Sequence, residues 1–136
     1  MESEAVAIAW PVGGARSEGA LVGEILSSVL SNGSCGLIDT DLLQSQKVLS
    51  AYGYVECLAD AGIAMVGGEP KQGQTLEEVR DLLLAEIEKV RKGEFDSDLL
   101  KSIIANYRRG EMANLESNFA RAYKMEAAFI NGLEWE

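Results

Sequence analysis

The sequence predicts an α+β fold in which a small antiparallel sheet carries its helices on one face, forming a two-layer sandwich. Two observations lead to this class. Two neighbouring strands are joined by a connection too short for a crossover, so they form an antiparallel hairpin. One further strand opens the chain, and the remaining periodic stretches have helical spacing. We expect residues 1–136 to form a single domain whose three-stranded sheet is thin for so many helices.

The first strand is expected over residues 4–10, where Val6, Ile8 and Trp10 point to one side and alanines lie between them. Pro11 should end it. The following loop, VGGARSEG, superficially resembles a phosphate cradle between a strand and a helix. Its glycine spacing matches neither GxGxxG nor the Walker pattern, and Glu18 would oppose an anion. We therefore expect a plain connection.

The next stretch predicts a helix over residues 19–30, a shorter helix over residues 37–46 and the two hairpin strands. Asn32-Gly33 ends the first helix, which has a broad apolar face made of Leu21, Val22, Ile25, Leu26, Val29 and Leu30. The strands are expected over residues 47–58 and 63–67, with a tight turn over residues 59–62. Small residues alternate with Tyr52, Tyr54 and Glu56, which leaves room for a helix to pack closely on the opposite face.

The helix predicted within residues 73–95 has the strongest signals in the chain. Thr75 and Glu78 form a capping-box pair, and Gly93 is placed to stop the helix. An apolar face with steps of three and four indicates burial against the sheet, and Leu82 and Leu84 widen it. The apolar positions are Leu76, Val79, Leu83, Ile87 and Val90.

Two further helices are expected after residue 95. Asp96-Ser97-Asp98 starts a long one, which continues through Met112 and Leu115 and breaks over residues 115–118. The last runs over residues 119–130 and stops at Asn131-Gly132. Met112, Tyr123, Met125 and Phe129 are interpreted as a packing face rather than a cofactor site, and as contacts for a neighbouring domain if the parent protein is longer. Trp135 follows as a large apolar residue that we expect to be exposed at the chain end. Arg108, Arg109 and Arg121 are interpreted as helix-surface charges rather than an anion site.

Composition excludes several classes of function. Twenty-two acidic and 12 basic residues give a net charge of −10, which opposes binding to a nucleic-acid backbone. No run of 18 apolar residues exists, so no membrane span is predicted. The chain has no histidine, which excludes a histidine general base, a Ser-His-Asp triad and the HExxH and HxxEH zinc motifs. No calcium-type acidic loop occurs.

The two cysteines suggest no framework of disulfides and match no zinc pattern. Cys35 and Cys57 are expected to be small buried apolar residues, with a single disulfide between them as the alternative. Cys57 also lies near Tyr52, Tyr54 and Glu56, which raises the option of a small enzyme. No base that could activate the thiol can be named, and aromatic packing across strands explains the tyrosines.

Several segments, in order and spacing, resemble the C-terminal, non-catalytic domain of pitrilysin/insulinase-like zinc metallopeptidases. The segments are SNGS, the start Gly36-Leu37-Ile38, the turn Asp60-Ala61-Gly62, GGEP, TLEEVRDLLLAEIEKVRKGEFD, LESNFARAY and NGLEW. Each one alone is a turn or a cap that any α+β domain could use. Their shared order carries the resemblance, which covers residues 13–135.

The resemblance implies a role within a larger protein. Members of that family contain repeated α+β domains, larger than this chain, which together enclose a chamber. One domain carries HxxEH and a downstream glutamate, which bind zinc and activate water. Degenerate domains close the chamber and help to hold the peptide substrate. Zinc is therefore expected in the catalytic domain of the parent, and no cofactor is expected in this chain.

This sequence departs from the active pattern of the family. The Arg and Tyr that assist substrate binding fall on Leu43 and Ser50, and Lys47 replaces a glycine. We therefore assign no catalytic, metal-binding or cofactor-binding residue, and we leave substrate-binding residues unknown. The chain is also shorter than the repeated domain of the family, so we expect an excised fragment.

The sequence thus predicts a non-catalytic, structural and substrate-enclosing domain of a zinc metallopeptidase. Its expected partners are the remaining domains of the parent and the peptide substrate of the parent. The alternative is a stand-alone module that captures a protein or peptide through its acidic surface or an exposed sheet edge. A homo-oligomer through the sheet edge or an apolar helix face is a further option. The resemblance allows an exported or periplasmic bacterial parent, but no residue decides the compartment.

Overall fold

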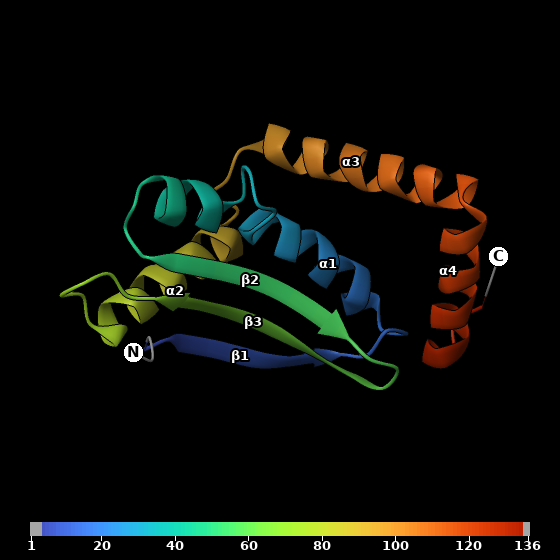
Figure 1. Cartoon of the computed structure of the whole chain (residues 1–136), viewed down its shortest axis with the longest axis horizontal. Coiled ribbons are helices and arrows are strands. Elements are labelled where there is room, and N and C mark those ends of the chain that lie inside the picture. The colour runs from blue at the N-terminus through green and yellow to red at the C-terminus, as the bar shows by residue number, and fades with distance from the viewer. Residues whose placement is uncertain (1–3, 135–136) are drawn as a thin grey trace.

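The computed structural model describes residues 4–134 and shows a three-stranded antiparallel sheet with its helices on one side (Figure 1). The strands are β1 (Val6–Gly13), β2 (Ser50–Cys57) and β3 (Ala61–Glu69), in the order β1-β3-β2. The helices are α1 (Glu18–Leu30), the π-helix η1 (Asp39–Gln44), α2 (Leu76–Lys92), α3 (Ser97–Glu116) and α4 (Asn118–Asn131). The α+β class and the order of the elements are as predicted. The predicted exposure of Trp135 lies outside the described residues.

Strand register divides the sheet into two faces. Ile8 and Gly53 both pair with Val66, and Val55 and Trp10 both pair with Ala64, so these side chains share the face toward the helices. Tyr52, Tyr54 and Met65 point to the opposite face, because side chains alternate along a strand.

Helices α1 and α2 lie directly on the sheet at positions where the strands carry small residues. A Cβ on Gly23 of α1 would lie 3.0 Å from Val55 Cγ1, and one on Gly68 of β3 would lie 3.2 Å from Val79 Cγ1 of α2. The prediction that glycines leave room for closely packed helices is confirmed. The fully buried core lies in this layer and consists of Val29, Ile38, Leu42, Val66, Val79 and Leu83.

Helix α2 forms as its local signals predict. Thr75 Oγ1 accepts a hydrogen bond from the Glu78 N–H, the Glu78 carboxylate accepts one from the Thr75 N–H, and Gly93 ends the helix with φ of 71°. Val79 and Leu83 are fully buried. Leu84 is exposed, so the predicted widening of the apolar face holds for Leu82 but not for Leu84.

The short segment before β2 is built around a buried carboxylate. Asp39 Oδ2 accepts hydrogen bonds from the backbone N–H groups of Asn32, Ser34 and Gly36 at 2.8–3.1 Å, and its Oδ1 accepts one from Ser31 Oγ at 3.0 Å. These bonds satisfy the donors that a sharp loop after α1 would otherwise leave without partners. The short helix predicted over residues 37–46 is present in part as η1, of π type.

A second polar cluster joins η1 to α2. Lys89 Nζ lies 2.7 Å from Asp41 Oδ2 and 2.9 Å from the carboxylate of the buried Glu86. The hydrogen bond from Lys89 lowers the pKa of Asp41, and the same bond raises the pKa of Lys89. The amine therefore offsets two negative charges, one of which is taken out of water.

The strand boundaries and the hairpin turn differ from the sequence predictions. Pro11 does not end β1, which extends to Gly13, because β1 is an edge strand and can accommodate a residue without an N–H. Strand β2 begins at Ser50 rather than at residue 47, because residues 45–49 lead out of η1. Strand β3 is longer than predicted at both ends. The hairpin turn is centred on Ala59-Asp60, since Cys57 already pairs with Gly62.

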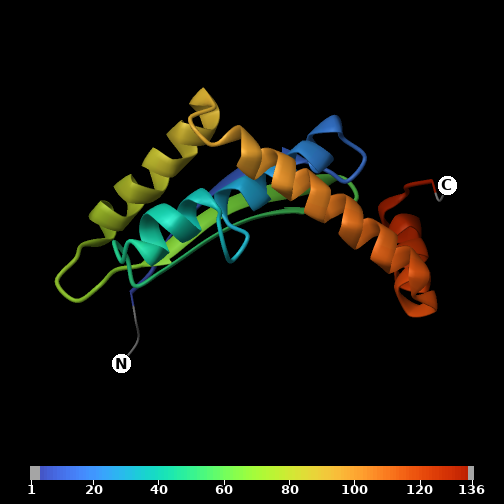
Figure 2. The ribbon, with the colours of Figure 1, turned by 90° about the horizontal axis from the view of Figure 1, so that it is seen from above.

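Helices α3 and α4 extend beyond this body. α3 packs against α1, and α4 turns away at Ser117 and makes its main contacts with α3 (Figures 1 and 2). The predicted break over residues 115–118 and the stop at Gly132, with φ of 65°, are confirmed. An ion pair between Lys124 and Glu111 joins the two helices. We call α3 and α4 the arm, and the remaining elements the body.

Candidate functional site

The three positions that the resemblance placed opposite family residues, Leu43, Lys47 and Ser50, have structural roles here. Leu43 packs against the core cluster, and Ser50 begins β2 opposite Glu69. Lys47 is exposed, and its backbone oxygen accepts a hydrogen bond from Gln74 Nε2 at 3.0 Å.

No metal centre is found in the part of the chain that the structure describes. Among residues 4–134, no three His, Cys, Asp or Glu side chains converge as metal ligands. Within the same residues, no helix combines the length and apolarity that crossing a bilayer requires.

Cysteine placement corrects part of the sequence prediction. Both thiols are free, and Cys35 is exposed rather than buried. The reason is local: the Cys35 N–H donates to Asn32 Oδ1 at 2.9 Å, so the residue lies on the outside of the loop that surrounds Asp39. Cys57 is half-buried and faces the helices, on the side of β2 opposite Tyr54 and Glu56.

The open face of the sheet carries the two tyrosines of β2. The Tyr52 and Tyr54 rings stack with centroids 6.1 Å apart. A Cβ on Gly67 would lie 2.4 Å from the Tyr52 hydroxyl, so the glycine lets this ring lie flat on β3. The Tyr54 hydroxyl lies 3.4 Å from Met65 Sδ. These contacts confirm aromatic packing across strands, and they provide no activated nucleophile.

The glycine-rich loop after β1 packs against the hairpin turn between β2 and β3. Backbone atoms of Ala59 and Asp60 would lie 2.6 Å from a Cβ on Gly14, so only glycine fits there. The Ala15 N–H donates to the Leu58 carbonyl at 2.8 Å, and Arg16 pairs with Asp60 at 2.9 Å. These contacts fix the loop against the hairpin turn.

The arm carries the most exposed of the large apolar side chains in the described residues. Phe119 is 83% exposed and Phe129 is 86% exposed, while the small Ala120, Ala127 and Ala128 occupy the half-buried side of α4. The helix therefore turns its apolar side chains outward. We call this the arm surface, made of Met112, Leu115, Phe119, Tyr123, Met125, Phe129 and Ile130. The predicted packing face of Met112, Tyr123, Met125 and Phe129 is thus uncovered within the described residues.

The three arginines singled out in the sequence lie exposed on the arm, as expected. Arg109 donates to Asn106 and Arg121 donates to Asn118, each on its own helix. Arg108 is also exposed. They do not converge on a common anion site.

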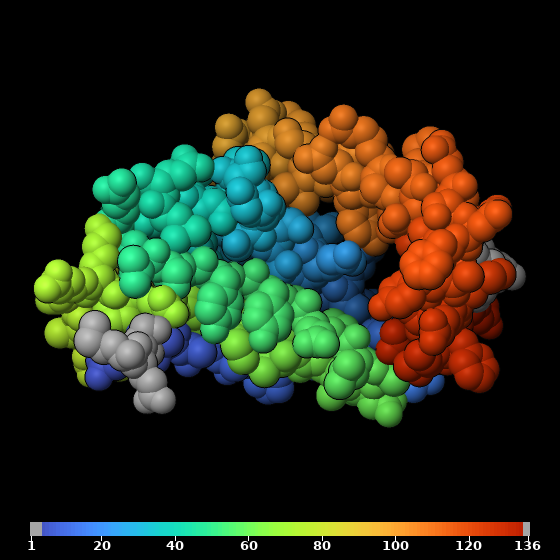
Figure 3. Space-filling model, in the orientation of Figure 1, coloured from blue at the N-terminus to red at the C-terminus, as the bar shows by residue number. Residues whose placement is uncertain are grey.

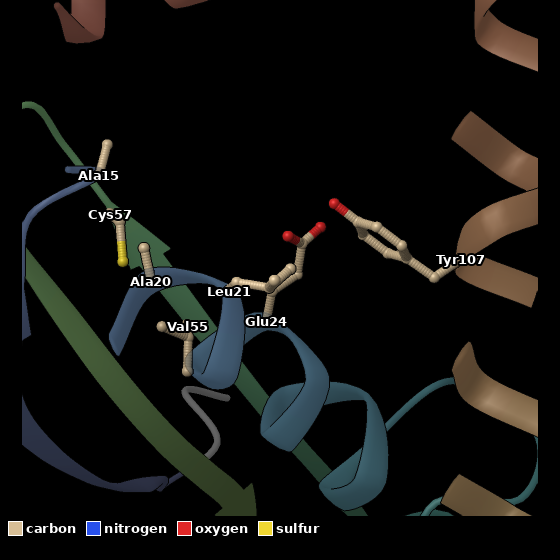
Figure 4. Close-up of a pocket in the computed structure, with 7 residues that line it drawn as sticks. All are labelled: Ala15, Ala20, Leu21, Glu24, Val55, Cys57 and Tyr107. Atoms are coloured by element: carbon tan, nitrogen blue, oxygen red, sulfur yellow. The ribbon is translucent and has the colours of Figure 1, made fainter. Parts of the chain in front are cut away.

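One pocket brings polar groups together from separate elements. It encloses about 400 Å³ between α1, α3 and the end of β2, and it is lined by Ala15, Ala20, Leu21, Glu24, Val55, Cys57 and Tyr107. Figure 3 shows the surface hollowed between α1 and the arm. In Figure 4 the Tyr107 hydroxyl points toward the Glu24 carboxylate, while Val55 and Cys57 of β2 lie farther from Tyr107. Sequence analysis missed this pair, because no spacing rule connects a residue of α1 to one of α3.

The pocket is electronegative. Burial raises the pKa of Tyr107, and the negative charges of Glu24 and Glu111 and a hydrogen bond with Glu24 raise it further. Each of these effects favours the neutral phenol. Tyr107 is therefore a neutral donor and acceptor at neutral pH, beside a carboxylate.

The fold and these surfaces define a class: an α+β domain with uncovered apolar surface, in which the described residues assemble no metal centre. A family model described as the Peptidase M16 inactive domain matches residues 1–107. The chain belongs to this family, which confirms the resemblance found in the sequence. The match ends within α3, so α4 lies beyond it.

Two solved structures share the fold. A protease from Helicobacter pylori is 20% identical with a TM-score of 0.86, and the alignment covers 94% of this chain and 31% of that chain. The inactive peptidase domain of a protein described as a zinc protease, from Bordetella parapertussis, is 14% identical with a TM-score of 0.79. That alignment covers 98% of this chain and 74% of that one. No match was found among the curated proteins.

Proposed function

We propose that this chain is a structural, substrate-enclosing domain of a zinc-dependent metallopeptidase. Membership of an inactive peptidase family is the observation that carries the proposal, and it accounts for the lack of histidine. In this proposal another domain of the parent holds the zinc and cleaves the peptide, and the present domain encloses the substrate and supports the catalytic part.

The arm surface supports a partnership with other domains. Contiguous exposed apolar side chains on a folded domain are typical of an interaction surface. The chain spans 31% of the Helicobacter pylori protease, which leaves most of that protein outside the alignment. We propose that a neighbouring domain of the parent covers Phe119, Tyr123 and Phe129, as the core of an interface.

The first experiment is to sequence the open reading frame around this segment. The proposal expects an upstream domain with an HxxEH motif in the same frame. The purified catalytic part and this chain would then be mixed, and zinc-dependent cleavage of a fluorogenic peptide measured. This chain alone should show no cleavage, and adding it should raise the activity of the catalytic part. A frame that begins at Met1 and stops at Glu136 would overturn the proposal.

The interface is tested with matched variants. Phe119→Glu and Phe129→Glu should weaken association with the catalytic part at least tenfold, because each places a charge in a desolvated contact. Leu49→Glu is the control, since Leu49 is also an exposed apolar residue but lies next to β2 and away from the arm. Equal weakening by all three variants would argue against the arm surface as the interface.

The alternative function, a stand-alone interaction module, has one observation in its favour. β1 and β2 are the two edges of the sheet, and neither has a second strand partner among residues 4–134. Exposed edges can capture an extended peptide. A frame confined to Met1–Glu136 would favour this function, and a pull-down with the whole chain would then identify the partner.

A further inference from the structure

The pocket between α1, α3 and β2 contains negative charge that no neighbouring cation neutralises. Glu24 forms no ion pair within residues 4–134. Arg16, next to the pocket residue Ala15, is paired with Asp60 at 2.9 Å. Lys124 of α4 is paired with Glu111, and Arg121 donates to Asn118 on its own helix. A group that enters the pocket therefore meets a carboxylate whose charge is available.

The remaining lining of the pocket is suited to an aliphatic chain. Leu21 and Val55 provide apolar contacts, and the short side chain of Ala20 also lines the pocket. The Tyr107 ring adds an aromatic face, which attracts cations. Carboxylate, phenol and apolar wall together match a long side chain with a charged end, because such side chains bury their methylene stems and keep the head group hydrogen-bonded.

We propose that this pocket binds the side chain of a lysine or arginine from another polypeptide segment. The stem lies against Leu21 and Val55, and the ammonium or guanidinium group donates hydrogen bonds to the Glu24 carboxylate and the Tyr107 hydroxyl oxygen. An anionic side chain is repelled by Glu24. A purely apolar side chain removes water from the carboxylate and supplies no hydrogen bonds in its place. This inference does not depend on the proposed function, because every residue of the pocket belongs to this chain.

The test is an NMR titration of the full 136-residue chain with short capped peptides. Acetyl-Gly-Lys-Gly-amide and its arginine analogue are the ligands, and the norleucine analogue is the control, since it keeps the stem and lacks the charge. We expect saturable shifts of the Leu21, Glu24, Cys57 and Tyr107 amides with lysine and arginine. The norleucine peptide should bind at least tenfold more weakly. Equal binding of the norleucine peptide would overturn the inference.

Matched variants separate the pocket from the general acidity of the chain. Glu24→Gln should weaken binding of the lysine peptide at least tenfold, and Tyr107→Phe should weaken it two- to fivefold because it keeps the ring. Glu18→Gln changes the same charge on the same helix outside the pocket and should bind like the native chain. Unchanged binding by Glu24→Gln, or equal weakening by Glu18→Gln, would refute the site. The amide spectra of the variants report whether each is folded.

The two proposals fail independently of one another. Loss of peptide binding leaves the association of this chain with a catalytic part unaffected, because that association is tested at the arm surface. Conversely, a reading frame confined to this chain removes the peptidase role and leaves the pocket intact. If the lysine peptide binds, competition by the catalytic part would show that the side chain comes from the parent protein. Binding that the catalytic part does not displace would indicate a substrate side chain.

Discussion

Helices α2 and α4 have comparable amphipathic patterns but opposite outcomes. In α2 the apolar face lies on the sheet, and Val79 and Leu83 are fully buried. In α4 the large apolar side chains point to solvent, and no residue of the helix is buried. An amphipathic pattern therefore indicates that the apolar face of a helix packs against a partner. It does not indicate whether that partner belongs to the same domain. The body completes its core with the help of α3, whose Ile103 packs with Val29 and Leu37, whereas α4 leaves its large apolar side chains uncovered.

The largest expected change in the free energy of unfolding comes from a mutation in the core of the body. Leu83→Ala removes a fully buried side chain from the centre of the core and should lower the free energy of unfolding by about 2–5 kcal/mol. Leu84→Ala, at the next position of the same helix, is the control. Because Leu84 is 36% exposed, its loss should be clearly smaller. Urea unfolding followed by circular dichroism measures both, and similar losses would contradict the assignment of the core to this face of α2.

The next largest change in the free energy of unfolding is expected from the loss of the buried Asp39 carboxylate. Asp39→Ala leaves three backbone N–H groups of the loop after α1 without their acceptor, so we expect a loss of about 2–3 kcal/mol. The control is Asp81→Ala, which removes an exposed aspartate and should change stability by less than about 0.5 kcal/mol. If the two variants unfold at the same urea concentration, the carboxylate does not organise the loop.

These elements also show what a sequence can specify. The limits of α2 and the break between α3 and α4 depend on caps within a few residues, and both were predicted correctly. Cys35 was misjudged because the short-range hydrogen bonds of the loop around Asp39 follow no sequence pattern, and Pro11 because its surroundings are set at a distance, by an edge position in the sheet. The Glu24–Tyr107 pocket was missed for the same reason, since α1 and α3 meet only in the folded chain.

A smaller effect concerns the contact between η1 and α2. Asp41→Asn removes the negative charge that pairs with Lys89, while Glu86 stays paired. Because the Lys89–Asp41 pair is about one-third exposed, we expect a loss of about 1 kcal/mol or less at pH 7. The pKa of Asp41 is lowered in the folded chain, so its stabilising contribution is present above the unfolded value of about 3.9 and is lost as the pH falls through the folded pKa.

Urea unfolding of the native chain and of Asp41→Asn across this pH range is the measurement. The difference in unfolding free energy should stay constant from pH 7 to pH 5 and shrink below about pH 4. A difference that grows with acidification would have the wrong sign for a carboxylate with a lowered pKa. It would show that Lys89 does not stabilise the charged form of Asp41.

The smallest expected change in stability tests the arm. Phe129→Ala removes a side chain that is 86% exposed, so the free energy of unfolding should change by less than about 0.5 kcal/mol, in contrast to Leu83→Ala. The chain should at the same time bind less of a hydrophobic dye, because part of the arm surface is removed. A loss of more than 2 kcal/mol would mean that Phe129 is covered by the chain itself in solution. The contrast between body and arm would then disappear, and the arm surface would no longer be available to a neighbouring domain.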